Sequence, residues 1–312
     1  MLEKIEIENF RNIKNLSFEP KRINLILGPN NVGKTTLLEA ILVSLIGLQE
    51  EDIISRYRLS GKDVWKRLFF LRSKYKSREY NLFFRERENP FKIRIKIKDV
   101  KYEITLENKD QGIFRIAKLG SKDIIRFGST YPNRGGNILN ISYCFLYPGI
   151  LNEIDLEEVW SELDKYGKTE SVKSIVRDHF GIESMEFSPL ITEDGRVYVL
   201  HYKKGKVKYP IFLLGSGARI SIVIALLSII NDIVLFDDFE IALHPDTIEV
   251  ISNILKDSKA QFFITTQSKE VIKSLVERIE DIQIIYFYRD CSYSIFSRDN
   301  AKEILEHTDE IR

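Results

Sequence analysis

Gly28-Pro29-Asn30-Asn31-Val32-Gly33-Lys34-Thr35 is the stretch that decides the fold of this chain. It follows the apolar run at 22–27, which predicts a buried strand, and it leads into the apolar segment at 35–48, which predicts a helix. A Gly-x4-Gly-Lys-Thr turn between a strand and a helix is typical of a P-loop. Its glycines let backbone N–H groups curl around phosphate oxygens, and the helix N-terminus adds positive potential.

The P-loop predicts that the chain binds ATP together with Mg²⁺. Lys34 is expected to reach the β- and γ-phosphates, and the Thr35 hydroxyl is expected to ligate the metal. Further nucleotide contacts are expected from Asn30, Asn31, Gly33 and Thr36.

A second element is the apolar stretch Ile233-Val234-Leu235-Phe236, which ends in Asp237-Asp238. An acid at the carboxyl end of a buried strand is placed to hold Mg²⁺ through water, which is the role expected of Asp237. The next carboxylate, Asp238, is placed to orient or deprotonate an attacking water. With the P-loop, these acids predict an ATPase.

A third element, Leu214-Gly215-Ser216-Gly217, stands directly before a predicted helix at 218–230. A Ser-Gly helix start offers N–H groups to an anion, so Ser216 and Gly217 are candidate nucleotide contacts. The alternative is that Ser216 is an ordinary N-cap.

Strands and helices alternate at both ends of the chain, and the middle is rich in strands. Short strands are expected at 81–85, 91–98, 101–107 and 113–118, helices within 151–181, and an antiparallel stretch at 185–209 with a turn at Glu193-Asp194-Gly195. This order predicts a single α/β head spanning 1–312. Its core lobe would comprise 1–49 and 210–312, with a β-rich and helical insertion at 50–209.

The order of these motifs resembles an ABC-type ATPase head, a P-loop NTPase fold with an antiparallel β lobe and an inserted helical lobe. Glu8-Asn9-Phe10-Arg11-Asn12 before the P-loop resembles the OLD, RecF and SMC-like group. The stretch from Asp237 to Leu243-His244-Pro245 resembles the Asp-Glu-x-Glu-x-x-Leu-His-Pro of OLD-like ATPases, and Thr265-Thr266-Gln267-Ser268 resembles their Thr-Thr-His-Ser.

The resemblance implies a homodimer in which two heads enclose two ATPs. Ser216 and Gly217 of one head would face the γ-phosphate bound to the other, and 243–245 would lie at the seam. Arg11 would also approach the nucleotide.

Two positions depart from the family pattern. Asp238 stands where the family has a catalytic Glu, and Gln267 stands where it has a His that senses the γ-phosphate. Because a base displaced by about 1 Å can cost on the order of 10²-fold in rate, slow turnover and a long-lived ATP-bound dimer are expected. Glu240 is an alternative base.

The composition is globular, with 44% apolar and 30% charged residues among 312 and a net charge of +1. Two unpaired cysteines favour a reducing cytoplasm. The longest apolar run, 220–230, is too short to span a bilayer, so no membrane association is expected.

Charge is unevenly distributed, because residues 62–101 hold fourteen basic and five acidic residues. Period 2 places four of the basic residues on one strand face: Lys92, Arg94, Lys96 and Lys98. Like charges along one face repel, so a nucleic-acid backbone is one expected partner, and a solvated outer face is the alternative.

The sequence therefore predicts a nucleotide switch that acts on DNA or with a separate nuclease or effector. Because the chain ends soon after its last predicted strand, any nuclease is expected on another polypeptide. A regulatory head with only a protein partner is the second possibility. A transporter subunit is the third, disfavoured because 144–149 lack the glutamine of the loop that couples transporter heads to membrane domains.

Overall fold

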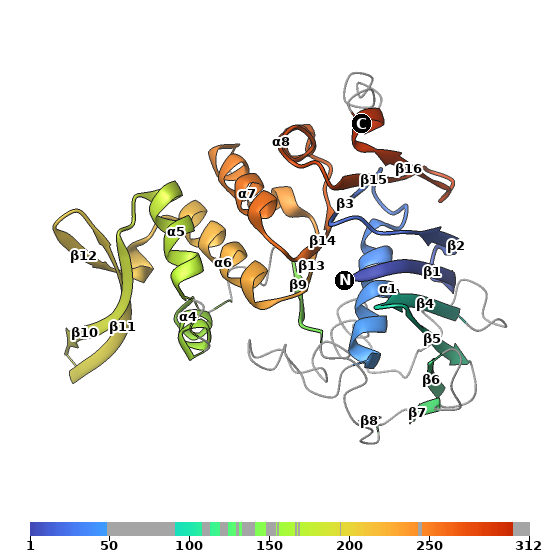
Figure 1. Cartoon of the computed structure of the whole chain (residues 1–312), viewed down its shortest axis with the longest axis horizontal. Helices are drawn as coiled ribbons and strands as arrows, with labels where there is room; N and C mark the ends of the chain where they lie inside the picture. The colour runs from blue at the N-terminus through green and yellow to red at the C-terminus, as the bar shows by residue number, and fades with distance from the viewer. Residues whose placement is uncertain are drawn as a thin grey trace.

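The structure is a computed structural model that describes residues 1–48, 91–107, 113–118, 124–128, 131–132, 141–147, 154, 156–165, 167, 169–193, 195–242 and 245–301. The expected strand at 81–85, the segment at 49–90 and residues 243–244 lie outside this description. Figure 1 shows three sheets, with helices between and around them.

The central sheet has six strands in the order β16-β15-β3-β14-β13-β9. Their bounds are β16 (Tyr293–Ser297), β15 (Ile282–Phe287), β3 (Ile23–Leu27), β14 (Gln261–Thr265), β13 (Ile233–Phe236) and β9 (Tyr143–Leu146). All adjacent pairs are parallel except β15 with β16, which are antiparallel. Every residue of β3, β13 and β14 is buried, as continuous apolar runs in a parallel sheet require. The expectation of strands there is confirmed.

Helix α1 (Lys34–Leu48) contacts β13 and β14 of the central sheet on one side and β1 and β4 of a second sheet on the other. Its apolar residues surround the helix on all sides, which suits an element buried between two sheets. The helix therefore holds the P-loop between both sheets.

The second sheet is antiparallel, in the order β2-β1-β4-β5-β6-β7-β8. Its strands are β1 (Leu2–Phe10), β2 (Ile13–Phe18), β4 (Phe91–Ile97), β5 (Val100–Glu107), β6 (Ile113–Lys118), β7 (Ile124–Gly128) and β8 (Tyr131–Pro132). Buried and partly exposed residues alternate along β4, which confirms the predicted period of two. The expected antiparallel succession of 91–118 is confirmed as well.

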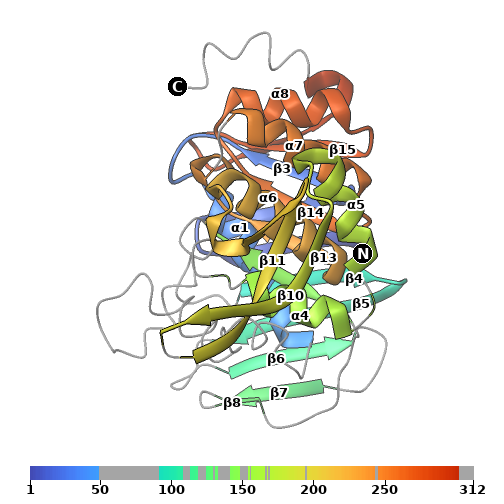
Figure 2. The same ribbon diagram turned by 90° about the vertical axis from the view of Figure 1, so that its left-hand side faces the viewer.

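The third sheet is β10-β11-β12, formed by β10 (Ser184–Thr192), β11 (Gly195–Lys204) and β12 (Val207–Pro210). Thr192 pairs with Gly195, so the predicted turn is present. Figures 1 and 2 show this sheet projecting from the side of the molecule, separated from the central sheet by α4 (Leu156–Lys165), α5 (Thr169–Phe180) and α6 (Ser216–Ile230).

Three further helical elements lie next to the strands of the central sheet. The 3-10 turn η4 (Phe239–Ala242) follows β13, α7 (Pro245–Asp257) precedes β14, and α8 (Lys269–Arg278) precedes β15. Among the described residues, no helix is long and apolar enough to cross a membrane.

The expected division into a core lobe and an insertion does not follow the sheets. β4 pairs with β1, and β9 pairs in parallel with β13, although both strands come from the range 50–209. No strand was predicted at β9.

Candidate active site

The P-loop joins β3 to α1 in a tight turn that requires glycine at its first position. Gly28 has φ +133°, and a Cβ there would lie 2.3 Å from the carbonyl oxygen of Phe287. Gly33, with φ +122°, and Asn31, with φ +64°, complete the curl. The β3–α1 turn is therefore shaped by its own backbone and by the end of β15.

Lys34 is held within this turn, with 6% of its surface exposed. Its ammonium group donates to the carbonyl oxygens of Gly28 and Pro29, each at 2.7 Å. Burial lowers the pKa of Lys34, and the neighbouring carboxylates of Asp238, Glu240 and Asp237 oppose this effect. The lysine is placed to bind an anion entering the loop.

Thr35 and Asp237 meet although they are 202 residues apart in the chain. The Thr35 hydroxyl lies 3.0 and 3.1 Å from the two carboxylate oxygens of Asp237. A hydroxyl and a carboxylate are the oxygen ligands that suit Mg²⁺, which binds through one or two carboxylates, water and substrate phosphates. The residues present therefore fit a magnesium ion, which Thr35 and Asp237 would hold.

Thr265, at the end of β14, organises both acids, and the sequence analysis assigned it no role. Its hydroxyl donates to Asp237 Oδ1 at 2.7 Å and accepts from the backbone N–H of Asp238 at 2.8 Å. Because β13 and β14 are parallel neighbours, their carboxyl ends share one sheet edge. The sequence shows the Thr265-Thr266 pair, but only the order of the strands shows that Thr265 lies beside Asp237 and Asp238.

Asp238 follows the end of β13 and has a left-handed backbone conformation, with φ +49°. Burial raises the pKa of its carboxyl, with further contributions from Asp237 and Glu240, while Lys34 opposes the rise. A carboxylate with a raised pKa, such as that of Asp238 near Lys34, is suited to accept a proton from water.

Gln267 connects the acidic edge with the P-loop. Its side-chain amide donates to Asn30 Oδ1 at 2.9 Å, and its backbone N–H donates to Glu240 Oε1 at 2.9 Å. The other oxygen, Glu240 Oε2, is buried and has no hydrogen-bond partner among the described residues. Glu240 thus holds the Gln267 loop in place and retains one acceptor for a further ligand.

The turn between β1 and β2 supports the P-loop through Asn12, which is part of the Glu8-Asn9-Phe10-Arg11-Asn12 motif but had no predicted role. Asn12 donates to the Asn31 carbonyl at 3.2 Å and accepts from the Thr36 hydroxyl at 2.8 Å. Its neighbour Arg11 forms an ion pair with Glu39 of α1. Arg11 is therefore engaged by the helix that follows the P-loop, and its expected contact with nucleotide stays a prediction.

The helix carrying Ser216 starts earlier than expected, and the alternative reading of Ser216 as N-cap is wrong. Gly215 is the N-cap of α6 and Ser216 its first residue, with an exposed side chain. A Cβ on Gly217 would lie 2.7 Å from Thr247 Oγ1 of α7. No described contact joins Ser216 or Gly217 to the P-loop of the same chain, and 243–244 lie outside the described residues.

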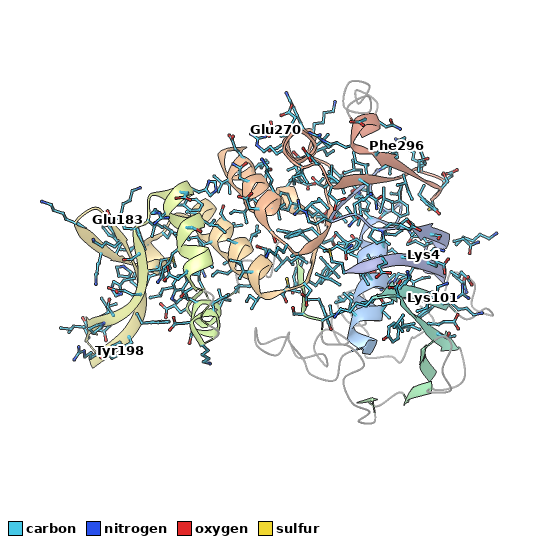
Figure 3. The ribbon with its side chains drawn as sticks, in the orientation of Figure 1. Lys4, Lys101, Glu183, Tyr198, Glu270 and Phe296 are labelled. Atoms are coloured by element: carbon cyan, nitrogen blue, oxygen red, sulfur yellow. The ribbon has the colours of Figure 1, made fainter. Side chains whose placement is uncertain are left out.

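The basic strand face is partly neutralised. Arg94 pairs with Glu8 of β1 and Glu103 of β5, and Lys96 pairs with Glu3 and Asp99. Lys4 of β1 and Lys101 of β5 lie opposite Lys96 on the neighbouring strands, and Figure 3 shows both at the outer side of this sheet. The argument from mutual repulsion is therefore wrong for Arg94 and Lys96, because acidic residues of neighbouring strands compensate both charges.

Comparison with known proteins shows the family and the fold of this chain. The sequence model of the AAA domain family matches residues 4–311. A 60-residue segment is 42% identical to the DNA replication and repair protein RecF of Chlorobium luteolum, covering 17% of this chain and 16% of RecF. A 61-residue segment is 41% identical to the chromosome partition protein Smc of Methanocaldococcus jannaschii, covering 19% of this chain and 5% of Smc.

Among solved structures, the SmcHead bound to the C-winged helix domain of ScpA is similar, with a TM-score of 0.53 at 14% identity over 96% of this chain and 99% of that one. This similarity confirms the predicted fold class, the α/β P-loop head of ABC type. The aligned segments span only 16% of RecF and 5% of Smc.

Proposed function

Because this chain belongs to the AAA domain family and has an SMC/RecF-like head, we propose that it is an ATP-binding and slowly ATP-hydrolysing switch. In this proposal it dimerises around two ATPs and acts on DNA or with a separate nuclease or effector. The observation that carries it is the convergence of Lys34, Thr35 and the paired acids at one sheet edge.

The proposed division of labour follows the contacts of the site. Lys34, Gly33, Asn30, Asn31 and Thr36 would bind the phosphates, while Thr35 and Asp237 would hold Mg²⁺. When bound, the metal would neutralise developing phosphate charge.

Asp238 would orient and deprotonate the attacking water, with Glu240 as the alternative base, and Gln267 would lie beside the γ-phosphate. Slow turnover is proposed because Asp238 is one methylene shorter than glutamate and Gln267 is uncharged. The motif Asp237-Asp238-Phe239-Glu240 supports an OLD-like member of the group. The proposal also includes the division of the chain into a core lobe and an insertion at 50–209.

Ser216→Arg is expected to prevent the ATP-dependent dimer. The exposed N-terminus of α6 would have to approach a phosphate on the second head, and a long side chain there would hold the heads apart. Light scattering with and without Mg²⁺-ATP measures the mass of wild type and variant. Wild type should double in mass on ATP, and the variant should stay monomeric yet bind ATP. A mass that ignores both nucleotide and substitution would contradict the dimer.

A DNA role is favoured over a purely protein-regulatory one by the segments similar to RecF and Smc. Lys92→Ala with Lys98→Ala is expected to weaken DNA binding and to reduce the slope of log K against log salt by about 2, one for each lost phosphate contact. Removing two lysines from the third sheet, Lys203→Ala with Lys208→Ala, is the matched control. Equal effects of both pairs, or none, would favour the protein-regulatory function.

A further inference from the structure

Most of the exposed large apolar side chains among the described residues lie in the third sheet and in the turn that follows it. Eight of the eleven exposed large hydrophobic residues in that part of the chain fall within 187–213. Scattered single apolar residues are normal on a protein surface, but a concentration of them marks an interaction site. Within this region, the segment that leads to the N-terminus of α6 lies next to Ser216, the residue proposed to face the partner head.

We name this segment the signature flank: Val207, Tyr209, Phe212 and Leu213. Val207 and Tyr209 belong to the edge strand β12, and Phe212 and Leu213 belong to the 3-10 turn η3 (Ile211–Leu213). Phe212 is 60% exposed and Leu213 59% exposed, so both project into solvent immediately before Ser216.

The flank leads directly into the start of α6. Leu214 N–H donates to the Ile211 carbonyl at 3.0 Å, and Arg219 N–H donates to the Gly215 carbonyl at 3.0 Å. The close approach of Gly217 to Thr247 fixes the same helix end against α7. Phe212 and Leu213 therefore stand in a hydrogen-bonded turn that Leu214 and Gly215 connect to the first residue of α6.

We propose that Phe212 and Leu213 pack against a second copy of this chain when two heads close around ATP. The inference rests on the dimer of the proposed function. Four residues of chain extend at most about 14 Å, so Phe212 lies within that reach of Ser216. When Ser216 approaches a phosphate bound to the partner head, the flank would be brought close to the surface of that head.

Phe212→Ser with Leu213→Ser tests the inference. The dissociation constant of the dimer should rise at least about tenfold, because two large apolar side chains no longer leave water. Sedimentation in Mg²⁺ and a non-hydrolysable ATP analogue measures the dimer, and titration of the monomer measures analogue binding. Analogue binding and thermal unfolding should match wild type, since neither residue contacts the P-loop and both are exposed.

Ile191→Ser with Tyr198→Ser is the matched control on the same lobe. These residues are 86% and 64% exposed, and Figure 3 places Tyr198 at the outer end of the third sheet. The control should dimerise like wild type. Loss of the dimer in both double variants, or in neither, overturns the role of the flank and leaves the ATP-driven dimer standing. A wild-type chain that binds the analogue and stays monomeric overturns the dimer itself, and the flank with it.

Discussion

Asp238→Asn is expected to lower ATP turnover by about a hundredfold or more while ATP binding remains, because the amide cannot accept a proton from water. The substitution keeps the shape of the side chain, and the hydrogen bond from Asp238 N–H to Thr265 is made by the backbone. Steady-state hydrolysis and equilibrium binding of ATP separate the two effects. We also expect the ATP-bound dimer of the variant to persist longer than that of wild type.

The pH profile distinguishes this role from a merely structural one. Burial and the charges of Asp237 and Glu240 raise the pKa of Asp238. The active form of a general base is deprotonated, so wild-type turnover should fall with decreasing pH at a higher pH than an ordinary aspartate, whose pKa is about 3.9, would give. Glu240→Gln is the comparison variant. If Glu240→Gln loses turnover and Asp238→Asn keeps it, the base is Glu240.

Gly28→Ala is expected to disrupt the P-loop and abolish ATP binding. A methyl group at this position would lie 2.3 Å from the Phe287 carbonyl oxygen, and φ +133° is a conformation that L side chains rarely adopt. Backbone groups cannot withdraw as a flexible side chain can, so the loop or the end of β15 must move. Urea unfolding should show a loss of about 2 kcal/mol or more, and calorimetry should detect no ATP binding.

Gly195→Ala is the control for strain alone. Gly195 has φ +123°, close to the value at Gly28, but no atom lies within 4 Å of the position of an added Cβ. This variant should lose only the cost of the positive φ, about 1–2 kcal/mol, and bind ATP normally. If both glycine variants bind ATP equally well, the contact between Gly28 and Phe287 does not shape the nucleotide loop.

The local motifs of this protein were predictable because their chemistry depends on short spacings. The P-loop needs two glycines, a lysine and a threonine within eight residues, and the acid pair needs an apolar strand directly before it. Continuous apolar runs identified β3 and β13, since strands buried on both faces leave little room for polar side chains. β9, which has four residues like β13, was not predicted.

Long-range partners were not predictable in this way. The sequence predicts that Lys92, Arg94, Lys96 and Lys98 repel one another along one strand face. Lys98 does not lie on that face, because β4 ends at Ile97 and Lys98 stands in the following turn with φ +47°. The acids that neutralise Arg94 come from β1 and β5, and only the strand register places them alongside.

The sequence by itself thus determined the nucleotide chemistry that we propose for this chain, through the P-loop motif and the acids Asp237 and Asp238. Only the tertiary structure decided how that chemistry is arranged: Thr265 bridging both acids, Asn12 supporting the P-loop, and Gln267 linking Asn30 to Glu240. The physical reason is that a phosphate loop is closed by neighbouring residues, whereas these hydrogen bonds join strand ends and turns that meet only when the sheets form.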